Sequence, residues 1–431
     1  MARGMFMVSA FVLCLFPAVL SFFFTGCLSL STSPAPEEVI KPQDYVIVTN
    51  SVSAKSKPSV TIIRYTGADQ VVSIPRTLGG LPVTSIAPRA FYSCGLTKVV
   101  IGNRVTCIGT SAFANTRSLD TVVIGASVTN IGIQAFAYGL NIKAFDVSKQ
   151  NTRYCSVDGV LFDKGRTTLV QYPNGRAGVY SIPESVTRIG DSAFWACYHL
   201  TSLTIPDSVT QIDNNAFDSC SRLTSVRIGA NVTRIGNSAF MYCENLPSID
   251  LPVRLVHIGN ASFAQCRGLT SITIPNSVEH IGNGAFSTCH KLTEVTLGNR
   301  VTYIGYNAFM ECRSLSRITW PSRTTTVDEN AFSYCHALAD VTLPEGVSVI
   351  RDLAFRGCTK LASITIPSTV TDIGLRAFAD CPSLKDVYFM GNAPHTGGCL
   401  WTKSDNVTVY YLRGKNGWGT TFCGSPTKIS E

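Results

Sequence analysis

The chain has 431 residues, of which 15% are charged and 45% are hydrophobic, and its formal net charge is +8. This composition excludes intrinsic disorder, because disordered chains are highly charged and poor in large apolar residues. It also excludes a polytopic membrane protein, since no apolar run after the first 26 residues approaches the ~20 residues needed to cross a bilayer. Lys and Arg form no run, so we expect no nucleic-acid partner.

The N-terminus has the pattern of a secretory signal. Arg3 is its only charged residue, an apolar stretch runs from Met5 to Phe24, and Thr-Gly precedes Cys27. This ending looks like a bacterial lipobox, so we expect residues 1–26 to be a signal peptide and Cys27 to be the lipidated first residue of the mature chain. The alternative is an uncleaved signal anchor, because the apolar stretch is long enough to span a membrane.

Residues 27–58 follow the signal, and the Ser- and Pro-rich stretch LSLSTSPAPEE comes directly after Cys27. Such a stretch cannot form a core. We therefore expect residues 27–58 to be a lipid-anchored tether and N-terminal lead-in.

The body of the chain repeats one unit of 23 residues. A phenylalanine after Ala or Ser recurs with this spacing from Phe194 to Phe378, in units close to AFxxCxxLTSVTIPxSVTxIGxx. Within a unit, the alternation Leu-x-x-Val-x-Ile predicts a short first strand with one buried face, proline ends it, and Val-Thr-x-Ile-Gly predicts a second short strand. One unit cannot cover its own apolar stripe, so the units must stack as a solenoid. Some thirteen coils at ~4.8 Å per strand would extend ~60–65 Å.

The solenoid is predicted to cover residues 59–390, with an imperfect first coil as its N-terminal cap. Residues 391–431 depart from the repeat. We expect them to form a C-terminal cap, because a bare terminal coil would expose its core and its strand edges.

An irregular insert is predicted at about residues 145–180, because Phe136 and Phe194 are 58 residues apart, which is not a multiple of the period. Inside it, Val160–Phe162 and Leu169–Tyr172 flank the turn sequence DKGR. These segments predict a β-hairpin.

The units LTSITIPNSVEHIGNGAFSTC (269–289) and LASITIPSTVTDIGLRAFADC (361–381) carry a family resemblance. The chain resembles the BspA-like leucine-rich repeat family, including its treponemal 23-residue type, over about residues 60–424. The resemblance implies a right-handed superhelix of short β-strands with irregular or 3-10 segments on the convex side. It also implies an exported or surface-anchored protein that binds host matrix proteins or other cells.

Ten of the 16 cysteines stand three residues after a repeated phenylalanine: Cys94, Cys197, Cys220, Cys243, Cys266, Cys289, Cys312, Cys335, Cys358 and Cys381. Neighbouring coils would place their Cα atoms ~5 Å apart, within disulfide range. The column lies between Phe and Leu of the buried face, however, where a thiol behaves as a small hydrophobe. Zinc ligands usually come in close-spaced pairs. We therefore expect inert buried thiols and no metal or cofactor, and Cys399 and Cys423 are better disulfide candidates.

The candidate ligand-binding residues are Arg234, His257, His280 and Tyr303, which occupy one outward position in four successive coils. They should stack as an exposed row, with the two histidines ~5 Å apart. Because histidine titrates near neutrality, one hypothesis is a pH-sensitive patch for an acidic or glycan ligand. The alternative is a solvated column without a function.

The other outward positions of the repeat give weaker indications of a binding function. Those on the first strand are mostly Ser and Thr, for which strand stacking is a sufficient reason. Four aromatic residues near the C-terminus are expected to close the core of the cap: Trp401, Tyr410, Tyr411 and Trp418.

No catalytic motif of the H-E-x-x-H or G-x-S-x-G type occurs in the sequence, so we expect a protein that is not an enzyme. The favoured interpretation is an outer-membrane or cell-surface lipoprotein that adheres to protein ligands, such as host matrix or other cells, by multivalent contact along a rigid face. It would touch the membrane through its lipid anchor. The alternative is a periplasmic protein with a structural or assembly role in the envelope.

Overall fold

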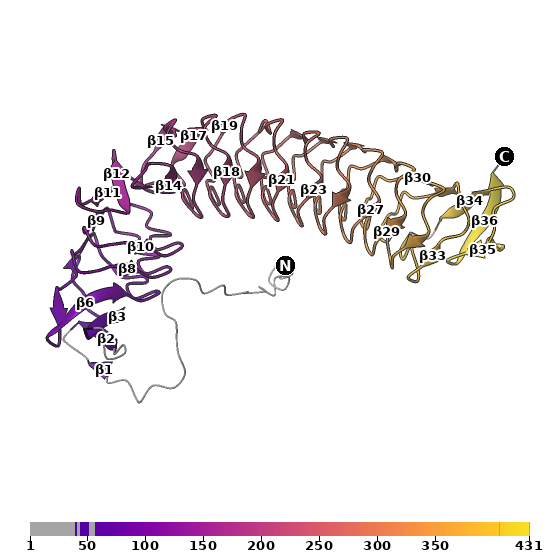
Figure 1. Cartoon of the computed structure of the whole chain (residues 1–431). Coiled ribbons are helices and arrows are strands. Elements are labelled where there is room, and N and C mark those ends of the chain that lie inside the picture. The colour runs from indigo at the N-terminus through magenta and orange to yellow at the C-terminus, as the bar shows by residue number, and fades with distance from the viewer. Residues whose placement is uncertain (1–38, 41–43, 51–56, 405, 431) are drawn as a thin grey trace, which may run out of the picture. The chain divides into compact units, whose positions relative to one another are not determined.

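The computed structural model describes residues 39–40, 44–50, 57–404 and 406–430. They belong to one compact unit, a β-solenoid of about 15 turns (Figure 1). The expected signal peptide and Cys27 lie outside the described residues. None of the described residues belongs to a helix able to cross a lipid bilayer.

The second strands of the repeat form one long sheet, which is parallel from β14 onward. In order of pairing it contains β12 (Tyr154–Val157), β13 (Val160–Asp163), β14 (Thr168–Gln171), β16 (Arg188–Ile189), β18 (Gln211–Ile212), β20 (Arg234–Ile235), β21 (His257–Ile258), β23 (His280–Ile281), β25 (Tyr303–Ile304), β27 (Thr326–Val327), β29 (Val349–Ile350), β31 (Asp372–Ile373) and β33 (His395–Thr396). A second sheet precedes it, with β1 (Val39–Ile40), β2 (Tyr45–Asn50), β3 (Ser59–Tyr65), β6 (Leu81–Ile86), β8 (Cys107–Ile108), β10 (Asn130–Ile131) and, beside β6, β5 (Thr77–Leu78).

The first strands of the repeat form four shorter sheets along the other side of the coils. They are β4 (Val71–Ser73), β7 (Lys98–Ile101), β9 (Thr121–Ile124) and β11 (Ala144–Val147); β15 (Gly178–Ser181), β17 (Leu200–Thr204) and β19 (Ser225–Arg227); β22 (Ser271–Thr273), β24 (Glu294–Thr296) and β26 (Arg317–Thr319); and β28 (Asp340–Thr342), β30 (Ser363–Ile366), β32 (Asp386–Phe389), β34 (Thr408–Leu412), β36 (Ser425–Ser430) and β35 (Thr421–Phe422).

The solenoid expected from the repeat is confirmed, with two differences. There are about 15 turns rather than thirteen, because strands outside the regular repeat, such as β3 and β34, also pair with the stack. The connections between strands in the described residues are irregular tight turns, and none is a 3-10 helix.

The predicted hairpin is also confirmed. β13 and β14 are antiparallel, with Phe162 opposite Leu169, and β12 adds a third strand to them. β14 then pairs in parallel with β16 and so begins the long sheet. The insert therefore joins the stack instead of standing apart from it.

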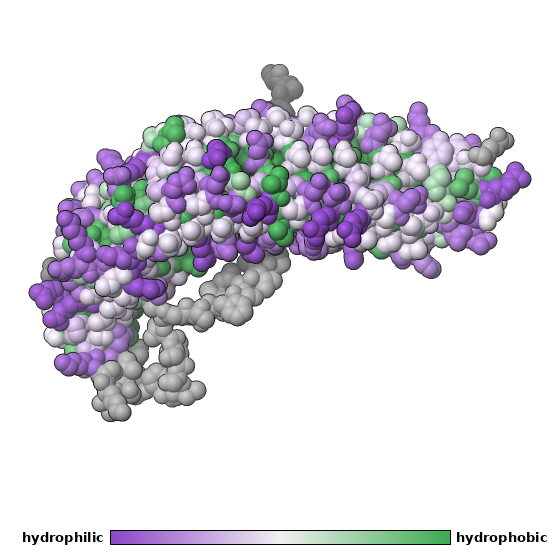
Figure 2. All heavy atoms as spheres, turned by 45° about the horizontal axis from the view of Figure 1, so that its top comes forward, coloured by the Kyte–Doolittle hydropathy of each residue, from purple (hydrophilic) through white to green (hydrophobic). Residues whose placement is uncertain are grey.

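The repeated phenylalanines form a continuous column through the core. From Phe194 to Phe378 every ring is fully buried, and neighbouring ring centroids are 4.9–5.6 Å apart. Stacked aromatic pairs contribute about 0.5–1.5 kcal/mol beyond the area they bury. Tyr172 occupies the same position before Phe194, with a centroid distance of 4.9 Å. The outer surface differs: on the face that Figure 2 presents, hydrophobic residues stand in small groups among hydrophilic ones.

Each phenylalanine also connects its coil to the next through the backbone. The N–H of Phe286, for example, donates to the Ala308 carbonyl at 2.8 Å. Two residues before and two after it, Gly284 and Thr288 have positive φ angles of 61° and 63°, and their N–H groups donate to the following coil at 2.7 Å. This conformation is costly for a residue with a side chain, but it satisfies buried backbone donors between coils.

We expect Phe286→Ala to destabilise the solenoid by about 3–5 kcal/mol, because the vacated volume is enclosed by two neighbouring rings. Urea unfolding followed by circular dichroism measures this change. Val253→Ala is the control: that side chain is 81% exposed, so its loss should change stability by less than about 0.5 kcal/mol. Equal effects of the two substitutions would contradict the role assigned to the column.

Candidate ligand-binding face

The four predicted ligand-binding residues lie side by side on the long sheet. Cα pairing in register joins Arg234 to His257, His257 to His280, and His280 to Tyr303, and the rings of His280 and Tyr303 have centroids 6.2 Å apart. The prediction of a row is confirmed. The prediction of full exposure holds for Arg234 and His280, whereas His257 and Tyr303 are half-buried.

A glycine stands two residues after each member of the row, just past the end of its strand: Gly236, Gly259, Gly282 and Gly305. Three of these glycines are buried, and Gly282 is half-buried. A Cβ atom on Gly259 would lie 2.5 Å from the carbonyl carbon of Gly236, so the backbones of successive coils approach each other closely at this position.

In the coils on either side of these four glycines, an acidic residue stands at the position of the glycine. Asp213 pairs with Arg188, with 2.6 Å between Oδ2 and Nε. At the other end Asp328 accepts a hydrogen bond of 2.5 Å from the Tyr303 hydroxyl and pairs with Arg351 at 3.3 Å. The glycine stretch therefore has a defined length of four coils.

A ladder of asparagines runs along the same four coils. The side-chain oxygens of Asn237 and Asn260 each accept a hydrogen bond of 2.8 Å from the backbone N–H of the asparagine in the next coil, and that of Asn283 accepts one of 3.1 Å from Tyr306. All three side chains are exposed. Within the described part of the chain, their Nδ2 groups have no acceptor. They therefore present a line of free hydrogen-bond donors.

We use the term polar strip for these three columns together. Its residues are Arg234, His257, His280 and Tyr303; Gly236, Gly259, Gly282 and Gly305; and Asn237, Asn260 and Asn283. The donors of asparagine and arginine favour a ligand rich in acceptors, such as carboxylates or carbonyl groups.

Burial, the charge of Arg234 and the neighbouring His280 together lower the pKa of His257 below its ordinary value of 6.5. His257 is therefore neutral at pH 7 and becomes positively charged only in acid. Burial and the hydrogen bond to Asp328 raise the pKa of Tyr303 to about 12, so this hydroxyl keeps its proton and continues to donate to Asp328.

The glycine and asparagine columns were missed by the sequence interpretation, although a signal was present. Ile-Gly-Asn occurs three times at the repeat spacing, beginning at Ile235, Ile258 and Ile281. The repeat template contains this glycine and has a variable position where the asparagine stands. The exposure of the asparagines and their pairing from coil to coil become visible only once the strands are placed in register.

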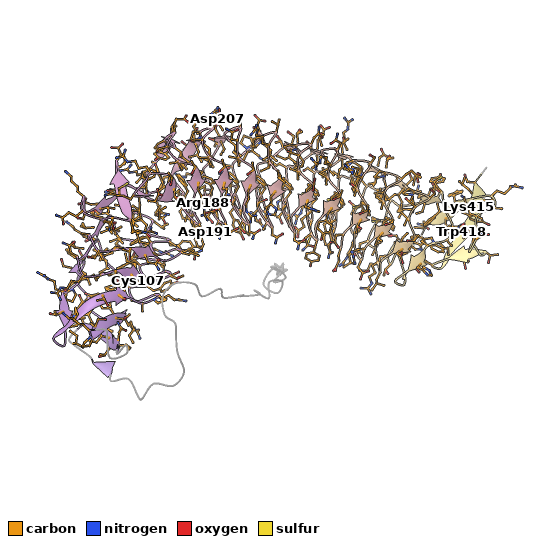
Figure 3. The ribbon with its side chains drawn as sticks, in the orientation of Figure 1. Cys107, Arg188, Asp191, Asp207, Lys415 and Trp418 are labelled. Atoms are coloured by element: carbon orange, nitrogen blue, oxygen red, sulfur yellow. The ribbon has the colours of Figure 1, made fainter. Side chains whose placement is uncertain are left out.

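Two shallow hollows lie beyond the ends of the polar strip. One of about 180 Å³ is lined by Arg188, Asp191 and Asp213 among others (Figure 3). The other, of about 400 Å³, is lined by Glu329, Arg351, Asp352, Asp372 and His395 among others. In the part of the chain that the structure describes, no group of three or more His, Cys, Asp or Glu side chains could hold a metal ion.

The cysteine column is buried in nine of its ten coils, as predicted, and Cys94 is the half-buried exception. From Cys220 to Cys381 each thiol also donates to the carbonyl of the phenylalanine in the preceding coil, at 3.1–3.4 Å. Ser404 continues the column and makes the same bond to Phe378 at 3.1 Å. Burial raises the pKa of Cys266 and of Cys312 to about 12, which leaves these thiols protonated and inert.

Cys399 and Cys423, the disulfide candidates of the C-terminal cap, are both free thiols. One aromatic residue of the cap differs from expectation. Tyr410 does not close the core: β34 alternates, so Val409 points inward and Tyr410 stacks on Tyr388, with ring centroids 4.9 Å apart.

The other three cap aromatics pack as predicted. Trp401 is buried, and the rings of Tyr411 and Trp418 stack at 5.1 Å against the core.

Similarity to known proteins agrees with this architecture. The family model of the BspA type leucine-rich repeat region matches residues 79–157, 178–293 and 256–385. The chain belongs to the BspA-type leucine-rich repeat family. None of the curated proteins matches it in sequence.

Two crystal structures of leucine-rich repeat proteins are similar to the chain. A leucine-rich cell surface protein of Faecalibacterium prausnitzii A2-165 is 30% identical, with 84% of this chain and 97% of that chain covered and a TM-score of 0.51. A protein of Bacteroides ovatus is 23% identical, covers 91% of this chain and 100% of its own, and has a TM-score of 0.54. The second similarity supports the fold alone.

We expect a thiol reagent such as N-ethylmaleimide to modify Cys399 first under native conditions and to leave the buried column, Cys197 to Cys381, unmodified. The reason is that Cys399 is exposed, whereas the column is inaccessible and protonated. Mass spectrometry of peptides after timed labelling measures this order, and labelling in urea is the control in which all cysteines react. Rapid native modification of Cys266 or Cys312 would contradict the assignment.

Proposed function

We propose that this protein binds protein ligands at the bacterial surface through the polar strip, without catalysing a reaction. Its membership of the BspA-type family and its similarity to a leucine-rich cell surface protein support the location. The observation that carries the binding proposal is the coincidence of the exposed amide donors of Asn237, Asn260 and Asn283 with the in-register row of Arg234, His257, His280 and Tyr303. Contacts repeated every ~4.8 Å suit an extended or repetitive ligand.

The ligand we propose is an acidic segment of a protein, such as a host matrix protein or a protein of another cell. Arg234 supplies a fixed positive charge, and the free amide groups of Asn237, Asn260 and Asn283 supply donors for carboxylates or peptide carbonyls. Individual contacts of this kind contribute about 0.5–1.5 kcal/mol each. Useful affinity therefore comes from several coils acting together.

Attachment to the cell is proposed to depend on Cys27. Export followed by lipidation of this residue would place the solenoid on the outer surface, with residues 28–58 as a tether. Lipid chains anchor a protein through burial of their methylene groups. A periplasmic position is the competing outcome.

We expect the double variant His257→Ala/His280→Ala to bind an immobilised acidic ligand about tenfold more weakly, since two contacts near 0.7 kcal/mol each are lost. The ligand is to be chosen by a binding screen over host matrix proteins, and surface plasmon resonance measures the affinity. The matched control is Thr326→Ala/His395→Ala, which alters the same row of the sheet outside the polar strip. This control should bind like the unsubstituted protein.

The affinity measured in the same experiment should also depend on pH. Because the pKa of His257 is lowered, its charge appears only as the pH falls below 6.5, so binding of an acidic ligand should strengthen between pH 7 and pH 5. The double histidine variant should lose this strengthening. Unchanged binding by the double variant would remove the strip as the ligand site.

We expect protease added to intact cells to cleave the wild-type protein, and the Cys27→Ala variant to incorporate no labelled fatty acid and to leave the cell envelope fraction. The physical reason is that the acylated cysteine is the proposed membrane attachment. A periplasmic protein serves as the control for envelope integrity. Protection of the chain until the outer membrane is broken would contradict surface display, and retained label in the variant would exclude Cys27 as the acceptor.

A further inference from the structure

A cluster of aromatic side chains lies where the insert interrupts the repeat. Tyr138 follows the coil of Phe136 and Trp195 follows Phe194, yet their rings have centroids only 5.1 Å apart. Gln134 Nε2 donates to Ser192 Oγ at 3.4 Å across the same boundary. The coil of Phe136 and the coil of Phe194, which the insert separates in the sequence, are therefore neighbours in space.

Other tyrosines converge on the same place. The phenols of Tyr198, Tyr92 and Tyr242 all lie near enough to Tyr138 to contribute, after burial, to raising its pKa. We use the term junction aromatic cluster for Tyr92, Tyr138, Trp195, Tyr198 and Tyr242. Tyr92, Tyr138 and Tyr242 are 43%, 37% and 39% exposed. Exposed Tyr and Trp are the residues most enriched in protein-binding hot spots, with Arg.

Asp218 stands in the coil after Trp195, where its backbone carbonyl accepts a hydrogen bond of 2.9 Å from the Ala196 N–H. The residue is 8% exposed, and its carboxylate accepts a hydrogen bond of 2.8 Å from the Ser219 hydroxyl. It forms no salt bridge with any residue that the structure describes. A buried carboxylate without a counter-ion is unfavourable, and its charge adds to the negative potential of the nearby aromatic ring faces.

One further observation indicates the kind of group that would bind. Tyr92 holds the Arg89 guanidinium over its ring at 4.2 Å, so a ring of this cluster accepts a cation within the chain. A lysine or arginine side chain of a ligand would make the same contact with an exposed ring that carries no cation of its own.

We propose that the junction aromatic cluster is a second docking surface, which takes lysine or arginine side chains of a partner protein over the exposed rings of Tyr138 and Tyr242, with Asp218 as their counter-charge. The ring of Tyr92 is already covered by Arg89. The whole chain carries a net charge of +8, which repels a basic partner, so binding at this site depends on the local negative charge of Asp218. The proposal is independent of the polar strip, whose proposed ligand is acidic.

The acid dependence of such binding follows from the surroundings of Asp218. Burial raises the pKa of Asp218 to about 6, although the Ser219 hydrogen bond opposes the shift. The titratable groups facing it are the phenols of Tyr138 and Tyr198 and the thiol of Cys243, and Arg117 acts on Tyr198. None of these groups changes charge between pH 5 and pH 7. If binding of a cationic ligand is lost as the pH falls from 7 to 5, the cause is therefore protonation of the Asp218 carboxylate.

The test measures fluorescence anisotropy of labelled hexalysine at low ionic strength, where exposed charges are least screened. We expect Asp218→Asn to weaken binding about tenfold and Tyr138→Ala about threefold. The matched controls are Tyr334→Ala, a tyrosine at the same repeat position as Tyr138 whose ring already carries Arg356 at 5.4 Å, and Asp340→Asn, an exposed carboxylate on β28. Both controls should bind hexalysine like the unsubstituted protein.

Several outcomes would overturn the proposal: no binding of hexalysine by the unsubstituted protein, equal weakening by the control variants, or unchanged binding below pH 6. Preferential binding of a neutral oligosaccharide such as maltohexaose would assign the cluster to sugars instead. Urea unfolding of each variant separates a local effect from misfolding, and the exposed Tyr242→Ala provides a second, milder substitution. The variant His257→Ala/His280→Ala should bind hexalysine normally, so failure here and failure of the polar strip are distinguishable.

Discussion

The stacking of one phenylalanine on the next is the constraint on which the rest of the structure depends. Each ring fills the space between two others, and the backbone N–H of the same residue donates to the following coil. Side-chain packing and backbone pairing therefore both depend on one residue of each coil. The length of the unit is not itself fixed by them, because Tyr172 stacks on Phe194 only 22 residues later and its N–H still donates to Ala193.

The cysteine column is a secondary consequence of this constraint. The phenylalanine carbonyl accepts the backbone N–H of the cysteine in its own coil and the thiol of the cysteine in the next, as at Phe263 with Cys266 and Cys289. Ser404 makes the equivalent bond at the end of the array. Each cysteine of the column therefore serves as a small buried hydrogen-bond donor. This bond between coils, in addition to the small size of the side chain, gives a physical reason why cysteine is repeated at this position.

A fixed register also creates functional surfaces from ordinary residues. Every outward position becomes a line of side chains ~4.8 Å apart, so a change of residue type at one position in four coils makes a distinct strip. The exposed asparagines Asn237, Asn260 and Asn283 illustrate this. Asp213 and Asp328 end the adjoining glycine stretch with their own partners. The junction aromatic cluster arises differently, from the place where the register is broken by the insert.

The sequence by itself determined the solenoid, the hairpin of β13 and β14, the buried cysteines and the row from Arg234 to Tyr303, because each follows from a period or from alternation along one strand. It did not reveal the outward stacking of Tyr410 on Tyr388, since an irregular segment has no repeat from which to read its register. The contact of Tyr138 with Trp195 and the isolation of Asp218 were likewise decided only by the tertiary structure. Periodic packing is a local property copied along the chain, whereas contacts across an insert depend on how its ends return to the stack.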